Sequence, residues 1–123
     1  MSLTTVQSGM LTTAPLPLAS AGLGMNGQTW SAPTRAIGTT YTNSTGYPIM
    51  VIVTCTGTGP PPPVIGCYVN SVLICQFTTA DYYTASAMTP MQQTSTFIVP
   101  NGLTYSLQVV AGSPTLTSWY ELR

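Results

Sequence analysis

Few side chains in this 123-residue sequence could carry out acid–base or nucleophilic chemistry. The chain has no His, and its only carboxylates, Asp81 and Glu121, lie in different predicted elements. General acid–base catalysis needs a His or a pair of neighbouring carboxylates, and a Ser or Cys nucleophile would lack a base and an orienting partner. No glycine-rich loop precedes a helical pattern, so no phosphate site is expected. The residues therefore predict a protein that is not an enzyme and has no cofactor.

Three cysteines, Cys55, Cys67 and Cys75, are the remaining reactive groups. The first five residues have neither the basic region nor the apolar region of a signal peptide. An odd number of cysteines without a signal peptide argues against a disulfide framework. Their spacing, in a chain without His, also lacks the paired ligands of a structural zinc site. We expect no metal site, and we expect thiols that pack as small apolar groups in the core.

The composition is dominated by the scarcity of charge. Charged residues make up 3% of the chain and the net charge is zero, whereas ordinary domains contain about 25% charged residues. Two arginines cannot displace enough counterions for nucleic-acid binding, and no apolar run reaches the roughly 18 residues of a membrane span. A neutral chain has no electrostatic repulsion between its copies. We therefore expect an obligate oligomer or a component of a larger assembly, made in a cytoplasm.

The pattern along the chain is that of short strands separated by turns. The central stretch, residues 35–53, predicts a strand, a turn at residues 43–46 and a second strand at residues 49–53. Residues 64–69 and 72–77 flank Asn70-Ser71 as a hairpin, residues 78–94 predict a long polar loop, and strands follow at residues 95–99, 103–109 and 116–123. Seven or eight such strands without an amphipathic helix predict an all-β fold, a jelly-roll-like antiparallel β-sandwich with an extended N-terminal arm.

The first and last strands of a sandwich are often neighbours, which bears on the few charges. Arg35 stands near the start of the folded part and Glu121 near its end. We expect them to form an ion pair across adjacent strands, because neither charge could be buried alone. The alternative is that both are exposed and never meet.

Residues 1–29 predict an extended attachment arm, and residues 30–123 the sandwich domain. Alternating prolines at positions 15 and 17 favour an extended conformation. The arm either binds a neighbouring copy or a larger assembly, or folds back on its own domain. Its candidate anchors are the apolar residues Leu3, Val6, Met10, Leu11, Leu16, Leu18 and Leu23.

Four segments in this order resemble the C-terminal modules of tailed-bacteriophage fibre and virion-surface proteins. They are Gln28-Thr29-Trp30, the stretch from Arg35 to Ile49, the stretch from Val99 to Tyr105, and the stretch from Leu116 to Arg123. The resemblance covers residues 28–123 and implies a trimeric β-sandwich knob. Fibres of this kind carry a long shaft between leader and knob, and the short arm here favours a compact protein on the virion surface.

The resemblance implies a non-enzymatic structural protein of a bacteriophage virion. We expect a homotrimeric cement or decoration protein whose arm binds the major capsid protein or another virion protein. The alternative is a short tail-fibre or spike tip that recognises a carbohydrate on the host surface. In that case Tyr82 and Tyr83, in the predicted long loop, are the candidate sugar contacts; the competing interpretation is that these tyrosines cover a core edge or a seam between subunits.

Overall fold

The described residues of the chain form β-strands and no helix. The computed structural model describes residues 22–25, 27–79, 81–84 and 87–123, with only the backbone described for residues 81–84, 87 and 88. The strands are β1 (Trp30–Ser31), β2 (Tyr41–Thr42), β3 (Ile49–Thr56), β4 (Val64–Val69), β5 (Val72–Thr78), β6 (Asp81–Thr84), β7 (Ala87–Pro90), β8 (Gln93–Val99), β9 (Thr104–Ala111) and β10 (Thr115–Leu122).

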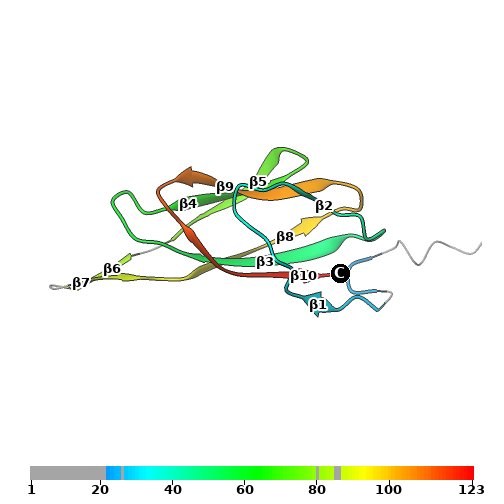
Figure 1. Cartoon of the computed structure of the whole chain (residues 1–123), viewed down its shortest axis with the longest axis horizontal. Helices are drawn as coiled ribbons and strands as arrows, with labels where there is room; N and C mark the ends of the chain where they lie inside the picture. Colours follow the sequence, from blue (N-terminus) through cyan, green and yellow to red (C-terminus); the bar gives the residue numbers. More distant parts are fainter. Residues whose placement is uncertain (1–21, 26, 80, 85–86) are drawn as a thin grey trace, which may run out of the picture.

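Eight of these strands make two four-stranded antiparallel sheets. Sheet A has the order β1-β10-β3-β8 and sheet B the order β2-β9-β4-β5. The two sheets form the two layers of a sandwich, and the hairpin of β6 and β7 extends from the end opposite the C-terminus (Figure 1). The predicted all-β sandwich is confirmed, and the first strand is indeed a neighbour of the last.

The core lies between the sheets because the inner strands alternate in burial. In β3, every second residue from Ile49 to Cys55 has no solvent exposure, which is the period of a strand with one face on the core. Sheet B contributes apolar side chains from β4 and β9 to the same layer. The buried apolar residues are Ile49, Val51, Val53, Cys55, Ile65, Cys67, Val69, Phe97, Val99, Tyr105, Leu107 and Trp119.

The central stretch crosses from one sheet to the other. The predicted strand before the turn is only β2, which belongs to sheet B, whereas β3 belongs to sheet A. The turn is where the sequence places it, and Asn43 organises it: its side-chain oxygen accepts hydrogen bonds from the Thr45 backbone (3.2 Å) and hydroxyl (2.7 Å). The Asn43 amide donates to the carbonyls of Tyr47 and Val99. Its buried position thus fixes the crossover against β8.

The predicted hairpin at residues 64–77 is confirmed. Asn70 and Ser71 both adopt positive φ, 50° and 64°, as the two-residue turns that match the twist of paired strands require. The predicted loop at residues 78–94 is wrong over most of its length. β6 and β7 pair there as a hairpin, with Tyr82 opposite Thr89, and β8 already begins at Gln93. The sequence of this segment has no alternation of apolar and polar residues that would have predicted these strands.

Candidate functional site

The inner face of β10 carries a buried carboxylate surrounded by hydrogen-bond donors. Glu121 has no solvent exposure, and its Oε1 accepts from Arg35 Nε at 2.9 Å, Tyr105 Oη at 2.8 Å and Trp119 Nε1 at 3.0 Å. Its Oε2 accepts from Arg123 Nη1 at 2.9 Å and Arg35 Nη2 at 3.3 Å. We call these five residues, together with Tyr41, the Glu121 cluster.

Aromatic rings enclose this cluster on its apolar side. The Arg35 guanidinium lies 4.2 Å from the centre of the Tyr41 ring, a cation–π contact. The rings of Tyr41, Tyr105 and Trp119 lie about 6 Å from one another. Tyr41 and Tyr105 belong to sheet B, whereas Trp119 and Glu121 belong to sheet A, so the cluster joins the two layers.

The protonation states of the cluster follow from this geometry. Burial alone would raise the pKa of Glu121, but the hydrogen bonds from Arg35 and Tyr105 outweigh burial, and the pKa lies below its ordinary value of 4.5. The hydrogen bond to Glu121 raises the pKa of Arg35 despite burial. Burial and the same carboxylate raise the pKa of Tyr105 to about 12. At neutral pH the cluster is therefore an ionised carboxylate held by two guanidinium groups.

This arrangement stabilises the fold and leaves the carboxylate little capacity to act as a base. Both oxygens of Glu121 are saturated by donors, and protonation would break charge-assisted hydrogen bonds. A removed partner would leave a buried charge uncompensated, at a cost of about 3–5 kcal/mol. The Glu121 cluster thus has a structural role: it stabilises the packing of sheet A against sheet B.

The structure brings the predicted pair, Arg35 and Glu121, together. Arg35 lies in the segment after β1 and not on a strand, so the pair does not span two adjacent strands. The sequence analysis missed Arg123, Tyr105 and Trp119 as partners of the same carboxylate. The sequence did hold one signal for Trp119. Trp119 and Glu121 are two residues apart on a strand, so their side chains lie on the same face and can contact each other.

One end of the outer face of sheet A is apolar on all four strands, whereas Thr54, Thr94 and Ser118 make it polar farther along. Register places Met50 between Ile98 and Leu122, and Trp30 beside Leu122; in the next row Ile52 lies beside Tyr120. Trp30, Ile98 and Tyr120 are 50%, 51% and 46% exposed. We call these six residues the sheet A face. Antiparallel sheets usually present polar side chains to water on their second face, and exposed apolar patches mark interaction sites.

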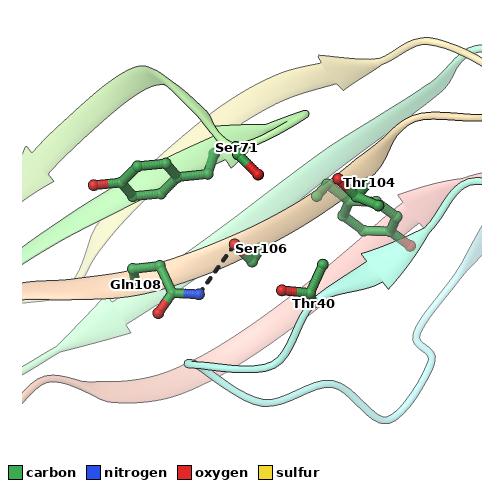
Figure 2. Close-up of a pocket in the computed structure, with 7 residues that line it drawn as sticks. Thr40, Ser71, Thr104, Ser106 and Gln108 are labelled. Carbon is green, nitrogen blue, oxygen red and sulfur yellow. Dashed lines mark hydrogen bonds between the residues drawn. The ribbon is translucent and has the colours of Figure 1, made fainter.

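The outer face of sheet B is different, because it carries a polar hollow of about 270 Å³. Ser106 and Gln108 lie on β9 between Thr40 on one side and Ser71 on the other (Figure 2). Gln108 Nε2 donates to Ser106 Oγ at 3.1 Å. All the residues that line the hollow are uncharged: Thr40, Tyr68, Ser71, Thr104, Tyr105, Ser106 and Gln108.

Most of the predicted contact residues fall outside the described part of the chain. This holds for the arm anchors Leu3, Val6, Met10, Leu11, Leu16 and Leu18, and for the side chains of Tyr82 and Tyr83 on β6. Leu23 is described and is partly buried. At the end of the arm, the backbones of Thr29 and Arg123 exchange two hydrogen bonds, at 2.9 and 3.0 Å.

Other classes of site were sought in the described residues. There, no group of three or more His, Cys, Asp or Glu side chains is placed to hold a metal ion, and no helix is long and apolar enough to cross a membrane. Comparison with known proteins found no matching family model, no matching curated protein and no matching solved structure.

The Glu121 cluster predicts a specific pH dependence of stability. Glu121→Gln keeps the shape but leaves two arginines without their carboxylate, and should lower the free energy of unfolding by about 3–5 kcal/mol at pH 7. The folded-state pKa of Glu121 is lowered, so its contribution is complete above pH 4.5 and is lost as pH falls through the folded value. The difference in free energy of unfolding between wild type and Glu121→Gln, measured by urea unfolding, should therefore become smaller as the pH falls below 4.5.

Asp81→Asn is the matched control, since it removes the other carboxylate of the chain, which lies in the β6–β7 hairpin. Its effect on stability should stay within about 0.5 kcal/mol. A gap between wild type and Glu121→Gln that stays constant from pH 7 to pH 3 would contradict the assigned role.

Proposed function

We propose that this protein is a non-enzymatic, self-associating structural protein of a bacteriophage virion surface. The observation that carries the proposal is the sheet A face, an exposed apolar surface that spans four strands in a chain with four charged side chains. The virion role and the number of copies, three, come from the resemblance of residues 28–123 to phage knob modules.

The occupant of the sheet A face is a second copy of the chain. The six residues of the face are uncharged, so the faces of three copies can meet around a threefold axis without repulsion and without the need to desolvate ions. The chain has no net charge to oppose the approach of its copies. Rotational symmetry then lets each copy bury the same kind of surface.

In the virion, the proposed trimer binds the major capsid protein or a neighbouring virion protein through residues 1–29. Binding to the assembled shell alone would stabilise that shell by mass action. A decoration protein should be present in many copies over the shell, whereas a tail tip should be present in few. Locating the chain in intact particles by cryo-electron microscopy separates these two placements.

A single substitution in the sheet A face tests the association. Ile98→Lys puts a charge at an exposed apolar position of edge strand β8, where burial would leave it without a partner. We expect light scattering after size exclusion to give a multiple of 12.9 kDa for the wild type and the single-chain mass for Ile98→Lys.

Gln76→Lys is the matched control, because Gln76 is exposed on β5, the edge strand of the other sheet. It should keep the wild-type mass. An unchanged mass for Ile98→Lys, or a wild type that is already a single chain, would contradict the proposal. The first of these outcomes would favour a different occupant of the face, such as the arm of the same chain.

The hollow on sheet B favours a second candidate function, recognition of a host-surface carbohydrate by a short tail-fibre or spike tip. Its lining offers hydroxyl and amide groups that match sugar hydroxyls, and Tyr68 offers an aromatic ring. Its volume lies just under the roughly 300–1,000 Å³ of ligand pockets for drug-sized molecules, which suits one sugar ring. The site thus lies on sheet B, in addition to any contact by Tyr82 and Tyr83.

A glycan array followed by titration tests this second function. Thr104→Val and Ser71→Ala each remove one hydroxyl from the hollow with little change in shape, and each should weaken binding about tenfold, the equivalent of one hydrogen bond of ~1.4 kcal/mol. Thr117→Val, an exposed position on β10, should bind as the wild type does. If glycan binding is lost only in Tyr82→Ala or Tyr83→Ala, the sugar site lies on the β6–β7 hairpin and not in the hollow. An array on which no glycan binds would refute the carbohydrate-binding function.

A further inference from the structure

Two of the three cysteines lie directly opposite each other in sheet B. Cys67 on β4 and Cys75 on β5 are partners in the antiparallel register. Such partners have Cα atoms about 4.5–5.5 Å apart, which falls within the roughly 4.4–6.8 Å that a disulfide spans. The register shifts at the next position, between Cys67 and Tyr68, and such an irregularity lets the backbone adjust locally.

Both side chains of this pair lie on the core side of sheet B. Cys67 is a buried core residue, and Cys75 is partly buried and packs against the core. Cys55, the third cysteine, is buried on β3 of the other sheet, so it has no cross-strand cysteine partner. The geometry therefore selects one pair out of the three possible pairs.

Cys75 is the thiol that an oxidant in solution would reach first. It is partly exposed, and its sulfur lies 3.6 Å from Ser95 Oγ at the seam where β5 contacts β8. Burial raises the pKa of Cys67, and the neighbouring Cys75 thiol raises it further; burial raises the pKa of Cys55 to about 11. Thiols with raised pKa values react slowly with external reagents, so the partly exposed Cys75 reacts first.

We propose that Cys67 and Cys75 form a cross-strand disulfide when the folded protein meets a small-molecule disulfide. The Cys75 thiolate attacks one sulfur of the oxidant, forming a mixed disulfide and expelling the first thiolate. Cys67 then attacks Cys75 Sγ, which breaks the mixed disulfide and expels the second thiolate. The two protein thiols lose two electrons and two protons, and the small disulfide is reduced to two thiols.

The product would bind edge strand β5 covalently to β4. Among the described strands, β5 is an edge strand that forms hydrogen bonds only with β4, so this bond would fix an edge of the sheet. The reaction would be suppressed in a reducing cytoplasm and would proceed in an oxidising medium. The inference rests on the register and on the shared core side of the two thiols, and it does not depend on the proposed virion role.

Oxidised glutathione tests this inference on the full chain. After incubation, free thiols are alkylated in denaturant and the intact mass is measured without reductant. We expect one alkylated thiol in place of three, no glutathione adduct, and a peptide map that joins Cys67 to Cys75 and places the free thiol at Cys55. Cys55→Ser should still lose two thiols, whereas Cys75→Ser should form no intramolecular disulfide.

Four outcomes would overturn the inference, and none requires a variant to fold. Three of them concern single chains. They are three alkylatable thiols after prolonged oxidation, a stable glutathione adduct at Cys75 that never closes, and a disulfide that includes Cys55. A disulfide between chains, seen as a doubled mass without reductant, would also overturn it.

Discussion

The fold depends on how the chain buries a single carboxylate. Glu121 receives hydrogen bonds from both arginines of the sequence, so three of the four charged side chains meet in one cluster between the sheets. Such a cluster is costly to desolvate, and its complete set of donors offsets that cost. It fixes β10 of sheet A against β9 of sheet B.

The two outer faces follow from that distribution of charge. With three of the four charged side chains in the Glu121 cluster, the molecule presents an apolar row on sheet A. Sheet B presents a neutral hollow lined by hydroxyl and amide groups, and its strands β5 and β9 also carry exposed apolar side chains. An apolar face that water would otherwise cover favours association, whereas a polar hollow favours a small uncharged ligand. The two faces are therefore suited to different partners, and one protein can use both at once.

The sequence predicted the parts of this structure that depend on local patterning. Period-two alternation and turn residues gave the sandwich and the Asn70-Ser71 hairpin, and the scarcity of charges made the Arg35–Glu121 pair the natural expectation. The β6–β7 hairpin escaped prediction because its residues lack apolar periodicity. The contact of Glu121 with Tyr105 on β9 depends on how the two sheets pack, and the opposition of Cys67 and Cys75 depends on strand register. The patterning of single strands reveals neither.

The central claim is that neutral apolar surface, and not ionic contact, holds copies of this chain together. Sedimentation equilibrium of the wild type at low and high salt tests it most directly. The account predicts an oligomer whose association constant is unchanged or strengthened by salt, because no ion pairs are screened at the interface. A single chain at micromolar concentration, or an oligomer that dissociates as salt is added, would contradict it.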